Sequence, residues 1–163
     1  MFKVGILTIS DKGAAGERAD TSGPQLAGVL PLQNFQVADL KIVPDDYEAI
    51  VAQLVAWSDT DRLDLILTTG GTGLSPRDVT PEATLAVAQR LVPGLPEAMR
   101  AASLAKTPHA MLSRGVAAIR GQTLIINLPG SPKGARENLE AVLPALPHAL
   151  EKLKGSQAEC GAG

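Results

Sequence analysis

The residues from 63 to 82 carry the chemistry that this sequence most clearly suggests. An apolar run at 63–68 passes into Thr69-Gly70-Gly71-Thr72-Gly73, and Arg77-Asp78 and the helix-start signal Thr80-Pro81-Glu82 follow. Glycine has no Cβ, so the amides of Gly70, Gly71 and Gly73 can approach phosphate oxygens closely. Open α/β sheets usually bind substrates at such loops, at the carboxyl ends of strands. We interpret residues 69–73 as a phosphate-binding loop, with a plain tight turn as the simpler alternative.

This loop differs from two well-known nucleotide motifs. It lacks the Gly-Lys-Ser/Thr ending of a Walker loop, and it does not carry the Gly-x-Gly-x-x-Gly dinucleotide fingerprint. The sequence therefore indicates a phosphate site of another type.

Two acidic positions lie where predicted strands end. Asp45 and Asp46 follow Val43-Pro44, and Asp78 follows the glycine loop. One acid of the first pair can cap the next helix while the other faces a pocket, and binding to amides near a helix start also explains Asp78. Parallel strands end at the same edge of a sheet, so we expect Asp45 and Asp78 to meet there. Two carboxylates beside a phosphate loop suit Mg²⁺.

A third strand-to-helix junction follows Asn127, at Leu128-Pro129-Gly130-Ser131-Pro132. Ser131 is the expected N-cap, with Pro132 at the first helical position. A helix N-terminus binds anions readily, and Lys133 is close in sequence. A capped helix start without a ligand explains the same residues. His109 and His148 show no metal-ligand spacing, so a zinc site is not expected.

The elements that must position these residues alternate between strand and helix. We expect strands at 4–9, 36–43 and 63–68, a hairpin of 116–120 and 123–127 around Gly121, and helices at 24–30, 47–57, 82–90, 95–104 and 133–153. Pro144 and Pro147 should kink or split the last helix. The long loop 11–23 is typical of a functional or disordered segment. The fold class is α/β, a three-layer α/β/α sandwich whose sheet is mostly parallel with an antiparallel hairpin.

The composition narrows the function classes. The 163 residues fit a single domain at 1–154 with a flexible tail at 155–163. A net charge of -2 and 2% aromatic residues argue against nucleic-acid and membrane partners. The single cysteine, Cys160, cannot form an intrachain disulfide, and no signal-peptide pattern opens the chain, so a cytoplasmic protein is expected.

Ordered motifs along residues 4–153 together resemble the molybdopterin adenylyltransferase family of the MogA type, and they are similar to the G domains of gephyrin. The motifs are Ile9-Ser10-Asp11, Asp20-Thr21-Ser22-Gly23, Val43-Pro44-Asp45-Asp46, Thr69-Gly70-Gly71-Thr72-Gly73, Arg77-Asp78-Val79-Thr80-Pro81-Glu82-Ala83-Thr84, Leu112-Ser113-Arg114 and Asn127-Leu128-Pro129-Gly130-Ser131-Pro132. The resemblance implies a homotrimer that transfers AMP from Mg-ATP to the terminal phosphate of molybdopterin. It also implies that the product passes to a molybdate-insertion protein.

The resemblance also assigns roles to residues. It makes Asp45 and Asp78 the catalytic residues and the Mg²⁺ ligands, and it places Ser113 and Asn127 on the pterin side. The other substrate-binding residues that it implies are Ser10, Asp11, Thr69, Gly70, Gly71, Thr72, Gly73, Pro129, Gly130 and Ser131. Two other functions remain open at this point: a catalytically silent molybdopterin carrier or scaffold of the MoaB type, and a nucleotide or phosphate hydrolase on the same sheet.

Overall fold

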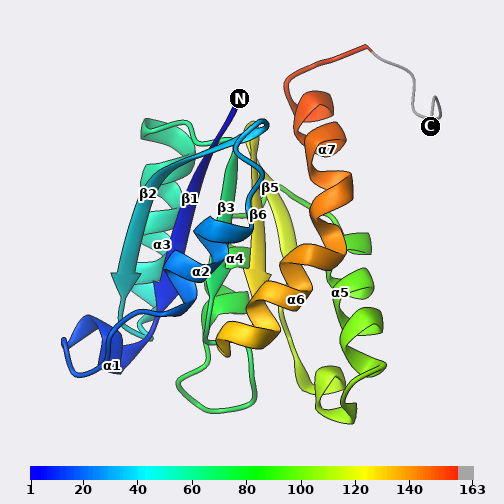
Figure 1. The fold of residues 1–163 in the computed structure, drawn as a ribbon. Helices are drawn as coiled ribbons and strands as arrows, with labels where there is room; N and C mark the ends of the chain where they lie inside the picture. Colours follow the sequence, from blue (N-terminus) through cyan, green and yellow to red (C-terminus); the bar gives the residue numbers. More distant parts are fainter. Residues whose placement is uncertain (158–163) are drawn as a thin grey trace.

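A mixed six-stranded sheet forms the middle layer of the protein, with the strand order β2-β1-β3-β6-β5-β4 (Figure 1). The strands are β1 (Phe2–Ile9), β2 (Phe35–Val43), β3 (Leu65–Thr69), β4 (Arg90–Leu91), β5 (Ala117–Arg120) and β6 (Thr123–Leu128). The computed structural model describes residues 1–157, so Cys160 and residues 158–163 of the expected tail lie outside the described residues.

The four strands β2, β1, β3 and β6 run parallel, whereas β5 is antiparallel to both β6 and β4. The expected hairpin is therefore present, and Gly121 in its turn has a φ of 57°, a left-handed conformation that glycine adopts without strain. The prediction of a mostly parallel sheet with an antiparallel hairpin is confirmed.

Helices cover both faces of the sheet, as expected for a three-layer sandwich. The helices are α1 (Asp11–Ala14), α2 (Ser22–Val29), α3 (Tyr47–Val55), α4 (Thr80–Val87), α5 (Gly94–Leu104), α6 (Pro132–Val142) and α7 (Leu146–Leu153). One hydrophobic cluster joins the sheet to α2, α5, α6 and α7, and a second joins it to α3 and α4. Side chains of a strand alternate between faces, so β1 sends Val4 and Ile6 into the first cluster and Leu7 and Ile9 into the second.

Trp57 closes the second cluster and is fully buried. Its ring packs over Gly5 of β1, where a Cβ would lie 2.7 Å from the indole Cε3 and 2.7 Å from Leu63 Cδ1. Trp57 belongs to a π-helical turn, Ala56–Thr60, so the expected helix at 47–57 keeps its α geometry only to Val55.

The helix expected at 82–90 is wrong at its carboxyl end. α4 ends at Val87, and Arg90–Leu91 form the edge strand β4. Around this strand, Gln89 N donates to Ile119 O and Val92 N donates to Ala117 O, each at 2.9 Å. These backbone groups form hydrogen bonds with the otherwise unpaired edge of β5, so long-range pairing overrides the local helical pattern.

Other elements differ from expectation mainly at their ends. α2 begins at Ser22 instead of residue 24, β3 is Leu65–Thr69 instead of 63–68, and the loop 11–23 contains the short helix α1. The helix expected at 133–153 splits as predicted, because the 3₁₀ turn Leu143–Ala145 separates α6 from α7. Within residues 1–157, none of the helices combines the length and apolar character needed to cross a membrane.

Candidate functional site

A cavity of about 470 Å³ opens at the carboxyl ends of the parallel strands. The chain passes from β1 to β2 on one side of the sheet and from β3 to β4 on the other, so the edge between β1 and β3 is a topological switch point, where α/β sheets bind ligands. Of the sequence-predicted site residues, the cavity brings together Ser10, Asp45, Thr69, Gly70, Gly71, Asp78, Gly130 and Ser131. Its lining does not include Asp11, Thr72, Gly73, Ser113, Asn127 or Pro129.

The glycine loop has backbone conformations that other residues rarely adopt. The φ angles of Gly70 and Gly71 are 105° and 67°. A Cβ on Gly70 would lie 2.3 Å from Ile9 O of β1, and one on Gly71 would lie 2.3 Å from Thr80 Oγ1. Buried Thr80 holds the loop from below: its Oγ1 donates to Gly70 O (2.9 Å) and its N donates to Gly71 O (3.2 Å). Close packing against Ile9 and Thr80 therefore requires glycine at both positions, and the phosphate-binding role of the loop stays a prediction.

The loops after β3 and β6 are joined directly. Thr69 Oγ1 donates to Pro129 O (2.6 Å), and Gly70 N donates to Leu128 O (3.2 Å). Gly130 lies so close to Gly70 that a Cβ on Gly130 would lie 3.3 Å from Gly70 Cα. Ser131 caps α6, as expected, because its Oγ accepts from Gly134 N at 3.1 Å. Pro129 does not line the cavity, but its carbonyl oxygen ties the loop after β6 to Thr69, which does.

The acids Asp45 and Asp46 divide their roles as anticipated. Asp46 Oδ2 accepts from Ala49 N at 2.9 Å and caps α3, whereas half-buried Asp45 lines the cavity. Asp78 lines the same cavity, and its Oδ2 accepts from Ser75 N within its own loop (3.0 Å). It does not cap α4, whose N-cap residue, Val79, makes no side-chain capping bond.

Asp45 and Asp78 repel each other across the glycine loop. A Cβ on Gly71 would lie 3.3 Å from Asp45 Oδ1, and a Cβ on Gly73 would lie 2.9 Å from Asp78 Oδ2. Partial burial raises the pKa of Asp45, and the charges of Asp11 and Asp78 raise it further. A hydrogen bond from the Asp11 amide and the charge of Arg77 oppose this rise. The cavity therefore concentrates negative charge that a bound cation would relieve.

The similarity of this chain to known proteins agrees with this geometry. A protein family described as a probable molybdopterin binding domain matches residues 5–148. The chain belongs to this family. Molybdopterin adenylyltransferase of Helicobacter pylori (strain J99) is 44% identical over 155 residues, which cover 94% of this chain and 88% of that protein. Gephyrin of Dictyostelium discoideum is 48% identical over 157 residues, and these cover 90% of this chain but 22% of gephyrin.

A solved structure has the same fold. It is described as the molybdopterin biosynthesis enzyme MoaB of Thermus thermophilus, with 60% identity and a TM-score of 0.91. The match covers 96% of this chain and 98% of the Thermus chain. The fold expected from the sequence is thus that of the molybdopterin-binding domain.

In this molybdopterin-binding domain, Arg114 organises the loop that carries Asp78. Its Nε donates to Gly73 O (2.8 Å), its Nη2 donates to Asp78 O (2.7 Å), and its backbone N donates to Thr72 O (2.9 Å). A further ion pair joins Arg114 to Glu82 of α4. The sequence alone assigned no role to Arg114. Its contacts with Gly73 and Asp78 join residues that are far apart in the chain, and no local motif indicates them.

Asn127 and Ser113 lie outside the cavity lining. Buried Asn127 donates from Nδ2 to Thr68 Oγ1 and Thr84 Oγ1, each at 3.0 Å, and its Oδ1 accepts from Val116 N at 3.2 Å. Asn127 therefore ties β6 to β3, α4 and the start of β5. Ser113 Oγ accepts from Gly115 N at 3.4 Å. Their assignment to the pterin side stays a prediction.

The cavity is also lined by residues that were absent from the expected site, namely Thr8, Ile9, Gly13, Arg18, Ala19, Asp20, Thr21 and Ser22. Asp20 accepts from Thr8 Oγ1 (2.9 Å) and from Gly23 N (3.0 Å), so it fixes the start of α2 against β1. Arg18 is the basic residue among those that line the cavity. The motif Asp20-Thr21-Ser22-Gly23 was the feature of the sequence that could have indicated this part of the cavity lining.

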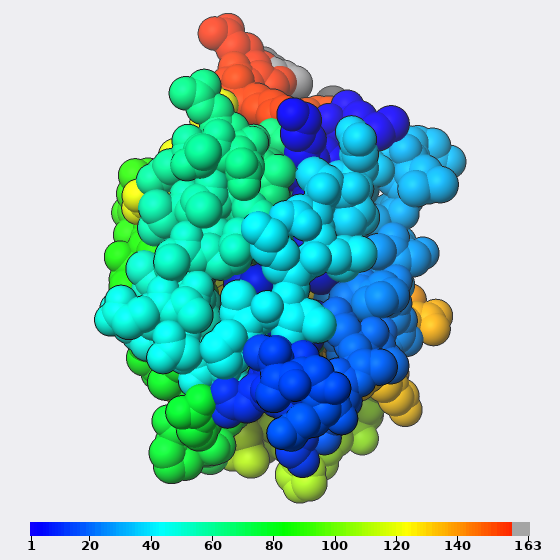
Figure 2. All heavy atoms as spheres, turned by 90° about the vertical axis from the view of Figure 1, so that its left-hand side faces the viewer, coloured from blue at the N-terminus to red at the C-terminus, as the bar shows by residue number. Residues whose placement is uncertain are grey.

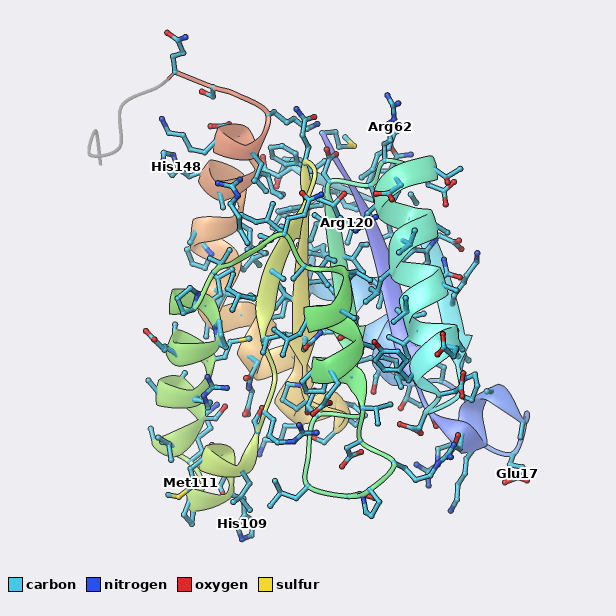
Figure 3. The ribbon with its side chains drawn as sticks, turned by 180° about the vertical axis from the view of Figure 1, so that it is seen from behind. Glu17, Arg62, His109, Met111, Arg120 and His148 are labelled. Carbon is cyan, nitrogen blue, oxygen red and sulfur yellow. The ribbon has the colours of Figure 1, made fainter. Side chains whose placement is uncertain are left out.

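The donor atoms present suit Mg²⁺. Asp45 Oδ1 accepts no hydrogen bond from any described residue, and Asp78 offers a second carboxylate in the same cavity. Within residues 1–157 no group of three or more His, Cys, Asp or Glu could hold a metal, and His109 and His148 lie at opposite ends of the molecule (Figure 3). Mg²⁺ usually takes one or two carboxylates and completes its shell with water and substrate phosphates. The residues therefore fit a cation shared with a phosphate substrate.

Proposed function

We propose that this protein is a molybdopterin adenylyltransferase that transfers AMP from ATP to the terminal phosphate of molybdopterin and releases pyrophosphate. The observation that carries the proposal is that Asp45 and Asp78 line one cavity together with Gly70 and Gly71. Family membership and the 44% identity to the adenylyltransferase of Helicobacter pylori support it.

The chemistry needs positioning more than it needs a base. The terminal phosphate of molybdopterin is already anionic at neutral pH, so its oxygen can attack the α-phosphorus of ATP without losing a proton. The new bond joins that oxygen to the α-phosphorus, and the bond to the β-phosphate oxygen breaks as pyrophosphate leaves. The protein must hold both phosphates in line and offset their charge, as in other phosphoryl transfers.

The residues of the cavity fit these two tasks. The amide of Gly71 is the group that would bind a phosphate oxygen, since its side-chain-free backbone lines the cavity, whereas the Gly70 amide already donates to Leu128 O. Asp45 and Asp78 would hold Mg²⁺. When bound, Mg²⁺ supplies positive charge that stabilises the triphosphate and its leaving group. Thr80 and Arg114 keep the loop between the two acids in place.

The second candidate function is a molybdopterin carrier or scaffold that does not catalyse the transfer. The observation that favours it is the 60% identity to the Thermus protein described as MoaB, because the MoaB type is the silent carrier that the sequence leaves open. Both candidates require the same cavity, and they differ in whether the aspartates act on ATP.

Pyrophosphate release from ATP separates these candidates. We expect release that requires both Mg²⁺ and molybdopterin. Molybdopterin binding without pyrophosphate release would support the carrier, and release in the absence of molybdopterin would point to a hydrolase instead.

Asp78→Asn tests the assignment of the acids. The variant keeps an oxygen for the Ser75 amide, so the loop should stay folded. We expect adenylyl transfer to fall by roughly 10²–10³, comparable with loss of one electrostatic group in other active sites, while molybdopterin binding remains. Asp46→Asn is the matched control, because it removes a neighbouring charge and asparagine still caps α3. Near-normal turnover by Asp78→Asn would refute the assignment.

The proposal includes the other expectations of the family resemblance. These are a homotrimer, a cytoplasmic location and transfer of the adenylylated product to a molybdate-insertion protein. Analytical ultracentrifugation of the purified protein measures the first of them.

A further inference from the structure

The rim of the cavity carries an ion pair that the proposed chemistry does not use. Arg77 Nε donates to Asp11 Oδ2 (2.9 Å), and Arg77 Nη2 donates to Asp11 Oδ1 (2.7 Å). The pair joins two segments 66 residues apart in sequence. Figure 2 shows these segments at the lower end of the molecule, where the blue α1 region lies beside the green loop before α4.

The ion pair continues into Asp45 through a reciprocal backbone contact. Asp11 N donates to Asp45 Oδ2 (2.9 Å), and Asp45 N donates to Asp11 Oδ1 (3.0 Å). Asp45 Oδ2 is therefore held by Asp11, the residue whose side chain pairs with Arg77. The other oxygen, Oδ1, lies beside Gly71, which also lines the cavity, and accepts no hydrogen bond from any described residue.

We propose that Arg77 is a positioning residue that acts through Asp11 to orient the carboxylate of Asp45 toward Asp78. The inference rests on the proposed function, in which Asp45 and Asp78 hold the cation. Arg77 directly precedes Asp78 in the chain, so the same contact fixes the separation of the two segments that carry the acids.

The exposure of the pair argues that its main effect is on the site. The side chains of Arg77 and Asp11 are 63% and 43% exposed. Exposed ion pairs contribute little to folding stability. The bidentate geometry nevertheless fixes an angle as well as a distance, and groups that orient metal ligands typically change metal affinity by 10-fold to 100-fold.

A direct contact between Arg77 and a substrate phosphate is the competing explanation. It predicts that Asp11 is dispensable and that removal of Arg77 leaves cation binding unchanged in the absence of nucleotide. The positioning role predicts that Arg77 and Asp11 act as one unit, so that their variants have effects that do not add.

The experiment is a titration of the intact protein with Mn²⁺, followed by electron paramagnetic resonance, without nucleotide. We expect Arg77→Gln and Asp11→Asn each to weaken Mn²⁺ binding by about 10-fold, and the double variant to be no weaker than the weaker single variant. Arg77→Lys keeps the charge but lacks the two parallel donors, so its Kd should lie nearer that of Arg77→Gln than that of wild type. Additive effects, full recovery by lysine, or unchanged Mn²⁺ binding in the single variants would overturn the proposal, as would a wild type that binds no Mn²⁺.

Arg136→Gln is the matched control. Arg136 pairs with Glu140 on α6 at 2.8 Å, with exposures of 54% and 45%, and it does not line the cavity. We expect its Mn²⁺ affinity to equal that of wild type. Thermal unfolding of every variant checks that folding is retained. If the Mn²⁺ results hold but wild type releases no pyrophosphate with molybdopterin, the positioning role stands and the proposed function fails.

Discussion

Replacement of Gly70 by alanine should damage folding and the cavity together. Gly70 has a φ of 105°, which side-chain-bearing residues rarely adopt, and its Cβ would lie 2.3 Å from the carbonyl oxygen of Ile9. That oxygen belongs to a central strand that cannot move without disturbing both core clusters. Backbone strain of this kind costs about 1–3 kcal/mol, and the clash adds to it. We expect Gly70→Ala to lower the free energy of unfolding by at least about 3 kcal/mol.

Two other glycines allow the cost of backbone strain to be measured separately from the cost of the steric clash. Gly121 has a φ of 57° and nothing within 4 Å of its Cβ position, so Gly121→Ala should cost only left-handed strain, about 1–2 kcal/mol. Gly28 lies in α2 with equally open space, so Gly28→Ala should stabilise the protein by up to about 1 kcal/mol.

Urea unfolding and thermal unfolding of the three variants measure these differences. For a chain of this size, about 3 kcal/mol corresponds to a fall in Tm of roughly 10 °C. Under the proposed function, adenylyl transfer by Gly70→Ala should also fall, because Ile9, Gly70 and Gly71 all line the cavity. The reasoning is refuted if Gly70→Ala is no less stable than Gly121→Ala.

Two further predictions concern residues away from the reacting groups. Asn127→Ala leaves the Val116 amide without its partner, so the free energy of unfolding measured in urea should fall by about 2–4 kcal/mol. A much smaller loss would show that Asn127 does not stabilise the contacts between these elements. Arg120 holds the pKa of Asp59 below its ordinary value of 3.8, so the pair stabilises the folded state above that pH and loses this effect as the pH falls through the lowered pKa. Asp59→Asn should therefore be less stable than wild type at pH 7, and the difference should shrink as the pH falls below 3.8. A difference that stays constant over this range would contradict the prediction.

The residues at helix starts and turns were predictable because their chemistry is local. Asp46 and Ser131 cap the helices that follow them, and Gly121 adopts the left-handed turn conformation. In each case the side chain and the backbone group that it satisfies lie within a few positions, so the sequence contains both partners. Pro144 separates α6 from α7 for the same reason, since proline lacks the amide that a helix interior requires.

Some residues could not be interpreted from their sequence neighbours alone, namely Asn127, Arg114 and Arg90. Asn127 lies near the end of a strand, like a ligand-binding residue, yet contacts with β3, with α4 and with Val116 hold it in the core. Arg114 stabilises the loop of Asp78 through backbone carbonyls that its own motif does not identify. Arg90 continues a helical pattern but pairs with β5. Their partners come from distant parts of the chain, and a partner's position depends on the packed sheet.

The sequence by itself determined the alternation of strands and helices, the glycine loop and the acids at strand ends, because apolar periodicity and backbone freedom are properties of neighbouring residues. Only the tertiary structure decided that β3 lies between β1 and β6, so that the loops after all three strands meet in one cavity. It also decided which oxygen of Asp45 stays free, since Asp11 and Arg77 occupy the other side. These outcomes depend on the burial of both sheet faces, which involves the whole chain at once.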